Sequence, residues 1–488
     1  MGTDAGNRTP DGMGRIWIAL AVGLPPLIAL LVPMATVDLA YQVRAGAEIW
    51  ATGALPATDS WTFTIAGTPW ADQQWLAQVL LSAVHGLGGW ELLAVLRAGL
   101  IAAVAALLVL TALRRGAGER TSAVLALLAF MLASPSLALR PQLFGILAFA
   151  ALLAVVAGRV HHPRVFLAAP LIVVVWANVH GSFVLAPLLL GWVWLDDVVR
   201  RRPSRRALVV LVAGCLATLV TPLGPGVWVY AAGIGANPVI AQTVSEWQRT
   251  TPFTVPGALF YLSLAASLVI VWRGRSRLAW PDTLWLAGMA VLAVWAVRGL
   301  AWWPAGAVPV LAAALAQPSR ESTPGPHTVR VGPRRLLAGV LLVAIVAALP
   351  WWRPGDVLTG RQGLLSYAPS GLALALRDRA VPGARVFVPQ PWGSWFEWAV
   401  PQARYFADAR FELFPPAVWA DLAVIGSGGE AADAALRRYD VEFVVWPASW
   451  PAPGADWEQI YRDEDGAVLR RPAQAIIGSS TNGRSGSE

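Results

Sequence analysis

The chain has one cysteine among its 488 residues, Cys215, and it has no lysine. A single cysteine excludes a disulfide framework within the chain and a zinc site built from cysteines. Charged residues make up only 14% of the chain and hydrophobic residues 56%, whereas soluble globular domains carry about a quarter charged residues. A chain this poor in charge needs lipid to cover its apolar surface.

All the basic residues are therefore arginines, and they give a net charge of +8. Their distribution argues against a nucleic-acid partner, because they cluster in short segments between apolar runs. That pattern orients membrane proteins, whose cytoplasmic loops are rich in basic residues. The sequence contains no P-loop, no dinucleotide-binding fingerprint and no His-Glu-x-x-His zinc motif.

Apolar runs recur along the first 350 residues. A membrane span needs about 20 apolar residues, with a tolerated range of roughly 17 to 25. On this basis we predict an α-helical polytopic membrane protein with about eleven transmembrane helices. The predicted spans are residues 15–36, 90–112, 121–138, 142–158, 164–179, 182–198, 207–222, 255–272, 281–297, 301–317 and 335–350. The first run is longer than the core of a signal peptide, so we expect it to be retained as an anchor.

The arginines also predict the topology. With the N-terminus in the cytoplasm, alternate loops carry the arginine clusters and the opposite loops have few, as the positive-inside rule requires. The outer face then receives the loop 37–89, the loop 223–254, two hairpin tips and the chain from 351 onward.

The sequence divides into three predicted parts. Residues 1–350 form the transmembrane domain, with 37–89 as a structured outer loop. We expect this loop to lie on the membrane surface, because its segments after Gly53 are rich in tryptophan, which favours the lipid headgroup level. Residues 351–472 form a small extracytoplasmic α/β domain, and 473–488 form a flexible polar tail. Within the second part, "ARVFVP" and "VEFVVWP" have the pattern of buried strands, "ADAALRRY" predicts a helix, and "EQIYRDEDGAVLRR" predicts a hairpin that turns at its Asp-Gly pair.

The segment "DLAYQVRAGAEIWATG" predicts one helix, with Asp38 as its N-cap and Gly53 just past its end. An apolar face, as in a helix that lies in the membrane interface, would be made by Leu39, Val43, Gly46 and Trp50. We interpret Asp38 in two compatible ways. It caps the helix and stops the first span, or it is a carboxylate at the membrane surface that takes a proton from an acceptor hydroxyl or helps to hold a metal.

Other polar residues are predicted to reach the same outer side, at loop tips or late in a loop. These are Arg140, Asn178, His180, Glu246, Arg249 and Arg298. Charges at membrane depth are costly and mark functional sites. Each also has a structural interpretation. Arg140 and Arg298 would extend to lipid headgroups, His180 would be a buried histidine with satisfied hydrogen bonds, and Glu246 and Arg249 would form a surface ion pair.

Taken together, a carboxylate, a histidine and two arginines are predicted at one face of an otherwise apolar protein. Arginines bind phosphate oxygens through their forked donors, and a carboxylate suits proton abstraction. This combination suits group transfer from a phosphate-linked, lipid-borne donor.

The stretch "DLAYQVRAGAEIWATGALPATDSWTFTIAGTPWADQQWLAQ" resembles the first outer loop of the bacterial GT-C superfamily of membrane glycosyltransferases. The segments "RPQLFG", "WANVHGSF", "VSEWQ" and "YFADARFELF" are also similar to that group, in an actinobacterial-type branch. The resemblance covers most of the chain. It implies an inverting transferase that uses a polyprenyl-phosphate sugar at the outer face of the bacterial cytoplasmic membrane, with Asp38 as the catalytic carboxylate. Tyr41 and Gln42 stand where relatives often carry Trp and His.

The partners that the resemblance implies are a polyprenyl-phosphate sugar donor, membrane lipid, and a cell-envelope glycan, lipid or protein as acceptor. The second carboxylate that is common beside the first is absent, so the first loop alone does not predict a metal site. A divalent metal is left open, and no other cofactor is predicted.

These inferences define a set of candidate site residues. The candidate catalytic residues are Asp38 and His180, and Arg140 and Arg298 are the candidates for binding the donor phosphate. The candidates for substrate binding are Gln42, Arg44, Asp59, Trp75 and Glu246.

Two further alternatives concern the whole chain and its C-terminal part. As an alternative to a glycosyltransferase, the whole chain is a lipid or polysaccharide transporter, or a non-catalytic scaffold with an outer sensor domain. The lack of internal repeats and of carboxylates within the spans argues against a transporter. Two interpretations are open for the C-terminal segment "QPWGSWFEWAVPQARYFADARFE": a sugar- or acceptor-binding surface, or a folded core with a local ion pair.

Overall fold

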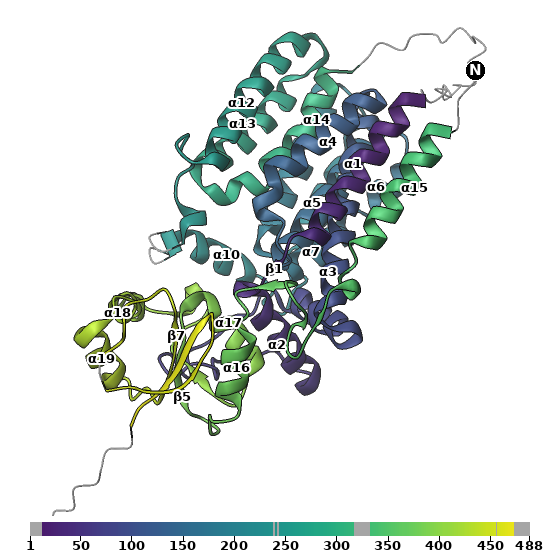
Figure 1. Ribbon diagram of the computed structural model, residues 1–488. Helices are drawn as coiled ribbons and strands as arrows, with labels where there is room; N and C mark the ends of the chain where they lie inside the picture. The colour runs from purple at the N-terminus through teal and green to yellow at the C-terminus, as the bar shows by residue number, and fades with distance from the viewer. Residues whose placement is uncertain (1–11, 238–239, 242–243, 317–331, 455, 473–488) are drawn as a thin grey trace, which may run out of the picture. The chain divides into compact units, whose positions relative to one another are not determined.

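The computed structural model describes residues 12–237, 240–241, 244–316, 332–454 and 456–472. The chain forms two compact units (Figure 1). Unit 1 contains the chain up to Asp59, residues 67–368 and residues 409–413, and unit 2 contains residues 60–66, 369–408 and the chain from 414 onward. The predicted tail 473–488 lies outside the described residues.

Unit 1 is mainly helical. Its principal helices are α1 (Gly12–Leu31), α2 (Thr36–Thr52), α3 (Trp75–Arg114), α4 (Glu119–Ala133), α5 (Pro141–Ala157), α6 (Pro163–Leu167), α7 (Ala169–Val179), α8 (Leu185–Val199), α9 (Arg205–Ala217), α10 (Gly226–Ala236), α12 (Val255–Gly274), α13 (Trp280–Trp295), α14 (Trp303–Ala314) and α15 (Gly332–Ala347). Short 3₁₀ helices include η2 (Gly181–Val184), η3 (Ser245–Trp247) and η5 (Val297–Ala301). Each predicted span overlaps one or more of these helices.

The apolar helices make the chain a multi-pass membrane protein. Within the described residues, four helical stretches are long and apolar enough to cross a membrane: Gly14–Leu31, Trp75–Arg114, Gly181–Val199 and Val255–Arg277. Shorter apolar helices include α5, α14 and the run Pro163–Val179. The count of about eleven spans stays a prediction.

Two segments that were predicted as outer loops are helical. Helix α3 begins at Trp75, well before the predicted start at residue 90, and it is interrupted at Gly88 and Gly89. Gly89 has φ 62°, a conformation that glycine adopts without a steric penalty. The apolar helix α10 lies within the predicted loop 223–254. The sequence did not predict the first part of α3, because polar residues precede residue 90, and it did not predict α10, because glycines interrupt its apolar run.

Helix α2 differs from the prediction at its start. Its N-cap is Ala35, and Asp38 lies in the first turn. The start is set by tertiary contacts, because strand β1 (Met34–Ala35) pairs in parallel with strand β4 (Leu365–Ser366). The predicted end is confirmed, since Gly53 is the C-cap with φ 66°.

Helix α2 packs against α3 and is largely buried. A Cβ at Gly46 would lie 2.0 Å from the carbonyl oxygen of Gln78, so only glycine permits this approach. Leu39 and Val43 are buried on the same side, but Trp50 is 75% exposed. The predicted four-residue apolar face is therefore wrong at Trp50, and the helix buries this face against protein.

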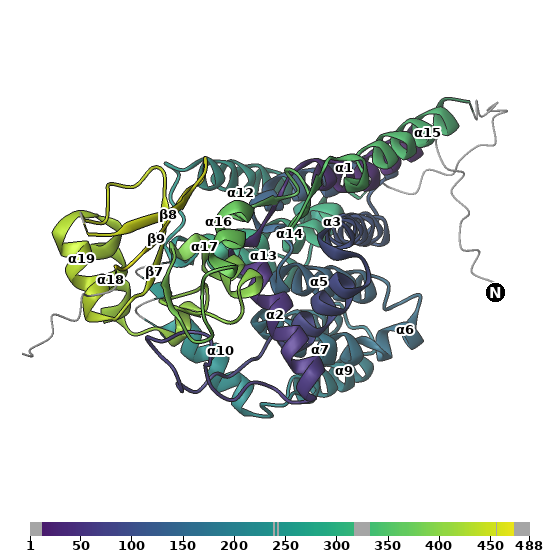
Figure 2. The ribbon, with the colours of Figure 1, turned by 60° about the horizontal axis from the view of Figure 1, so that its bottom comes forward.

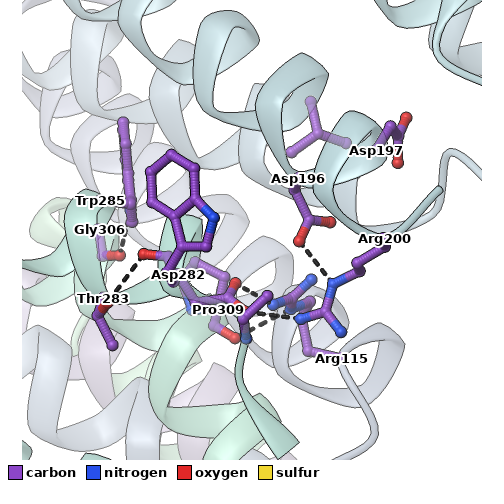
Figure 3. A network of polar contacts seen from close by, with 12 residues as sticks. Arg115, Asp196, Asp197, Arg200, Asp282, Thr283, Trp285, Gly306 and Pro309 are labelled. Carbon is purple, nitrogen blue, oxygen red and sulfur yellow. Dashed lines mark hydrogen bonds and ion pairs between the residues drawn. The ribbon is translucent and has the colours of Figure 1, made fainter. Parts of the chain in front are cut away.

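A buried ion-pair network joins three helix ends on the side of unit 1 where α3 and α8 finish (Figure 3). Asp282, near the start of α13, accepts hydrogen bonds from Arg115 at 2.7 Å and from Arg200 at 2.7 Å. Arg200 also pairs with Asp196 at 2.6 Å. Arg159, which follows α5, pairs with Asp196 at 2.6 Å. These contacts fix the ends of α3, α5 and α8 to the start of α13.

Unit 2 contains a five-stranded sheet of order β6-β5-β7-β9-β8. The strands are β5 (Arg385–Phe387), β6 (Arg404–Tyr405), β7 (Phe443–Pro447), β8 (Glu458–Arg462) and β9 (Gly466–Arg470). Strand β5 pairs in parallel with β6 and β7, and β9 pairs antiparallel with β7 and β8. Strands are thus present in both predicted strand segments, and β8 and β9 form the predicted hairpin.

Helices cover both faces of this sheet (Figures 1 and 2). On one face lie α18 (Pro416–Gly426) and α19 (Gly429–Arg438), and on the other lie α16 (Ser370–Arg377) and α17 (Gln390–Ala399). Helix α19 includes most of the predicted segment "ADAALRRY". Trp395 on α17 is fully buried and stacks on Trp398 with ring centroids 5.2 Å apart.

The first loop is not one surface unit, because residues 60–66 belong to unit 2. Thr62 forms a parallel bridge with Tyr405 of β6, and the Tyr405 amide donates to the Trp61 carbonyl at 3.0 Å. Trp61 is 2% exposed. This tryptophan is therefore part of a protein core, and the prediction that the whole tryptophan-rich loop lies on the membrane surface is wrong for this segment.

Candidate functional site

Five of the predicted site residues come together in unit 1, from five separate elements. Asp38 lies in the first turn of α2, Arg140 directly precedes α5, His180 lies between α7 and η2, Glu246 is in η3 and Arg298 is in η5. Each lies at or beside the end of a helix or in a short 3₁₀ helix. We call these five residues the polar cluster.

Arg140 joins the two carboxylates of the polar cluster. Its Nη1 lies 3.2 Å from Asp38 Oδ2, and its Nη2 lies 2.7 Å from Glu246 Oε1. Burial alone would lower the pKa of Arg140, but the two carboxylates raise it above its ordinary value. The Asp38 side chain remains 31% exposed, so a further group can reach it.

Glu246 lies between the two arginines. Its Oε2 is 3.9 Å from Arg298 Nη1, and the Arg298 guanidinium lies over the Trp247 ring at 5.4 Å. Burial would raise the pKa of Glu246, but Arg140 and Arg298 hold that pKa below its ordinary value, so the carboxylate is ionised. Arg249 is exposed, and the predicted pair between Glu246 and Arg249 is wrong.

His180 is 4% exposed, and its two ring nitrogens have different partners. Nδ1 accepts from the Ser182 amide at 3.1 Å and lies 2.7 Å from Ser182 Oγ. Nε2 lies 3.4 Å from Arg298 Nη2. Burial, together with the nearby charges of Arg298 and Arg140, lowers the pKa of His180 well below its ordinary value, so the ring is neutral near pH 7.

The remaining predicted residues make other contacts. Gln42 is buried and donates to the Tyr41 hydroxyl at 2.5 Å. Trp75 donates to Asn178 Oδ1 at 2.9 Å. Arg44 pairs with Glu48, four residues along α2, at 2.9 Å. These are contacts within and between α2, α3 and α7.

Asp59 is fully buried in a different ion pair. Its Oδ1 lies 2.5 Å from Arg410 Nη2, and the Arg410 guanidinium lies 4.5 Å from the centroid of the Trp70 ring. The structure therefore places Asp59 beside Arg410, in the interior of unit 1. The separation of 351 residues explains why the sequence did not indicate this partner.

The polar cluster does not offer a metal site. Arg140 lies against both carboxylates, which leaves them poorly arranged to share a cation, and His180 faces Arg298. The described residues contain no group of three or more His, Cys, Asp or Glu side chains placed to hold a metal ion.

Asp72 is a titratable residue that the sequence analysis did not single out. It lies in "WADQQW", just before α3, and is 6% exposed. Its Oδ1 accepts from Gln78 at 2.9 Å, whereas Oδ2 is buried without a hydrogen-bond partner in the described part of the chain. Burial raises the pKa of Asp72 to about 7, and the nearby Glu412 charge adds to this effect. The feature of the sequence that could have indicated Asp72 is an acidic residue inside a tryptophan-rich segment.

Asp72→Asn is expected to stabilise the protein at neutral pH. The folded pKa of about 7 lies above the ordinary value of 3.8, so the folded state keeps a proton that the unfolded state releases, and wild-type stability falls as pH rises from about 4 to 7. Asparagine does not titrate and can still accept from Gln78. At pH 7 the gain in the free energy of unfolding is at most roughly 4 kcal/mol, because each unit of pKa difference between the folded and unfolded states contributes about 1.4 kcal/mol.

This effect can be measured as the thermal unfolding midpoint in detergent between pH 4 and 8. The difference between variant and wild type should vanish near pH 4. The control is Asp440→Asn, at a carboxylate whose side chain is 77% exposed. Parallel pH profiles for wild type and Asp72→Asn would contradict the raised pKa.

Comparisons with known proteins show the fold. No family model and no curated protein matches the sequence. The oligosaccharyltransferase of Archaeoglobus fulgidus, solved with a tethered acceptor peptide, is similar over 89% of this chain and 69% of its own, with 13% identity and a TM-score of 0.54. The arabinofuranosyltransferase AftD from Mycobacteria is similar over 92% of this chain but only 37% of its own, with 17% identity and a TM-score of 0.54.

The apo form of ArnT from Cupriavidus metallidurans is similar over 94% of this chain and 97% of its own, with 13% identity and a TM-score of 0.50. The prediction of a GT-C-like fold is therefore confirmed. At these identities the comparisons show the fold alone.

Proposed function

We propose that this chain, which has the fold of these membrane glycosyltransferases, transfers a sugar from a polyprenyl-phosphate donor to a cell-envelope acceptor. The observation that carries the proposal is the polar cluster, in which two partly exposed carboxylates, Asp38 and Glu246, lie beside two arginines in an otherwise apolar helical unit. A carboxylate suits proton abstraction, and the arginines suit a phosphate leaving group.

In the proposed reaction Asp38 is the base. The acceptor hydroxyl gives its proton to the Asp38 carboxylate as its oxygen attacks the anomeric carbon of the sugar. The bond between that carbon and the phosphate oxygen breaks, and the electron pair leaves with the polyprenyl phosphate. Attack from the face opposite the leaving group inverts the anomeric centre.

Arg140 and Arg298 stabilise the charge that develops on the phosphate. Both guanidiniums approach Glu246, at 2.7 Å and 3.9 Å, so this carboxylate balances their charges when no donor is bound. Arginine is well suited to the role, because its planar fork can donate two hydrogen bonds to one phosphate. The donor phosphate would then take the position near the two guanidiniums.

Helix α5 supports the proposed orientation. Arg140 of the polar cluster directly precedes α5, and Arg159 of the buried ion-pair network lies two residues after the end of α5 at Ala157. The 17 residues of α5 span about 25 Å at 1.5 Å per residue, so the two groups lie far apart along the helix axis. By the positive-inside rule the arginine-rich end would be cytoplasmic and the polar cluster would lie outside.

The test is transfer by the purified full chain in proteoliposomes. Undecaprenyl phosphate, which ArnT from Cupriavidus metallidurans binds, is a suitable carrier, charged with each of several labelled sugars and offered with cell-envelope acceptor extracts. We expect label to move to the acceptor as free undecaprenyl phosphate appears. Arg140→Gln should slow this transfer by roughly 100-fold or more, since a donor to the developing charge is lost.

The matched control is Arg249→Gln, because Arg249 is an exposed arginine three residues after Glu246. It should transfer at the wild-type rate. Consumption of a nucleotide sugar in place of the lipid-linked one would contradict the proposal, and so would equal rates for the Arg140 and Arg249 variants.

A further inference from the structure

The two nitrogens of the His180 ring cannot exchange roles in this structure. Nδ1 lies 3.1 Å from the backbone N–H of Ser182, and a backbone amide can only donate. Nδ1 must therefore present its lone pair. In an imidazole whose Nδ1 carries no proton, the proton is on Nε2.

The Ser182 hydroxyl strengthens this assignment. Trp176 Nε1, which can only donate, lies 2.9 Å from Ser182 Oγ. The hydroxyl oxygen thus accepts from Trp176, and its own hydrogen is left to point at Nδ1, 2.7 Å away. Trp176 is fully buried, so its indole N–H depends on the Ser182 hydroxyl oxygen as its acceptor.

The Nε2–H of His180 then faces another donor. Arg298 Nη2 lies 3.4 Å from Nε2, and a guanidinium has no acceptor. His180 is 4% exposed, so the donor at Nε2 is largely shielded from bulk water. A buried N–H and a guanidinium that converge in this way lack the negatively charged oxygen that would satisfy both.

We propose that His180 Nε2–H and Arg298 together bind one oxygen of the donor phosphate, and that Ser182 is a positioning residue that fixes the His180 tautomer. This inference rests on the proposed sugar transfer and assigns His180 to the leaving group, as a hydrogen-bond donor. His180 is then not the base, and proton abstraction falls to Asp38. A phosphate monoester oxygen is the chemistry recognised, whether it comes from a lipid carrier or from free phosphate.

The experiment measures binding of undecaprenyl phosphate to the full chain in nanodiscs by native mass spectrometry. His180→Gln keeps an N–H donor near the position of Nε2, and it should bind the lipid within about threefold of wild type. His180→Phe keeps a flat ring but has no donor, and it should bind at least about tenfold more weakly, which is about 1.4 kcal/mol. Equal binding by wild type and His180→Phe would overturn the inference.

Ser182→Ala tests the positioning role. It should weaken lipid binding about threefold in the wild-type background, because the hydroxyl is lost and only the backbone N–H of residue 182 is left to hold Nδ1. In the His180→Gln background the same change should have no effect, because the glutamine amide has no tautomer to fix. A merely structural contribution of Ser182 would weaken binding equally in both backgrounds and would overturn its assignment.

The results of these binding experiments also distinguish this inference from the proposed function. Loss of transfer with full lipid binding in His180→Phe would overturn the inference and leave the transferase standing. Failure of the wild type to bind undecaprenyl phosphate would overturn both. Inorganic phosphate should displace the lipid only at about a thousandfold higher concentration, because it lacks the apolar chain; equal potency would overturn the assignment to a lipid carrier.

Discussion

Replacement of Asp38 by asparagine is expected to reduce sugar transfer by roughly 1000-fold or more, within the range for general acid–base catalysis. Asparagine has the same shape, and its Oδ1 can still accept from Arg140, which lies 3.2 Å from the carboxylate in the wild type. It cannot take the acceptor proton near pH 7. Asp38 lies in the first turn of α2, so loss of its charge should cost only about 0.3–1 kcal/mol of stability.

The measurement is initial transfer rate in proteoliposomes, together with the thermal midpoint to show that the variant is folded. Glu48→Gln is the control, because it neutralises another carboxylate of α2, one whose side chain is 43% exposed, and it should transfer normally. If the chain were a lipid transporter or a scaffold, neither substitution should change its function much. Transfer by Asp38→Asn at half the wild-type rate would therefore refute the role of Asp38.

Asp282→Ala is expected to destabilise the protein by about 3–5 kcal/mol, the usual result of removing one partner from a buried ion pair. The Asp282 side chain is fully buried and lies 2.7 Å from both Arg115 and Arg200 (Figure 3). Its loss leaves the Arg115 guanidinium, whose side chain is 11% exposed, without its carboxylate partner. The backbone of Ala279 also loses an acceptor at 3.1 Å.

This loss can be measured as the free energy of unfolding in mixed micelles with a graded denaturing detergent. Glu48→Ala, which breaks the more exposed pair with Arg44, should cost less than about 1 kcal/mol. Because the network and the polar cluster lie at opposite ends of α5, residual transfer per folded molecule should be close to wild type. A loss below about 1 kcal/mol for Asp282→Ala would mean that water replaces the missing carboxylate.

Much of the helical architecture could be predicted from local sequence, because an apolar run of sufficient length must be covered by lipid or protein and must satisfy its backbone internally. The same reasoning placed Asp38, Arg140, His180, Glu246 and Arg298 on one side, since each follows or precedes an apolar run. The structure brings these five residues together, and their roles in transfer stay predictions.

Local sequence was a poorer guide wherever polar residues are buried against protein. The segment with Asp72 and Gln78 was predicted to be a surface loop, yet it leads into α3 and is buried. Trp61 was predicted to lie at the headgroup level, yet it packs in unit 2. Tryptophan and glutamine are as compatible with a satisfied interior as with an interface, so composition alone could not separate the two.

The sequence by itself determined the class of the protein, because apolar length is a local property, and its arginine placement predicts the side of the bilayer on which the polar residues gather. Only the tertiary structure decided which charges meet. Glu246 pairs with Arg140 and not with the nearby Arg249, Asp59 pairs with Arg410, and Thr36 at the start of α2 bonds to Ser366, 330 residues away. Such partners depend on how the helices pack, and a buried charge takes whichever opposite charge that packing brings within reach.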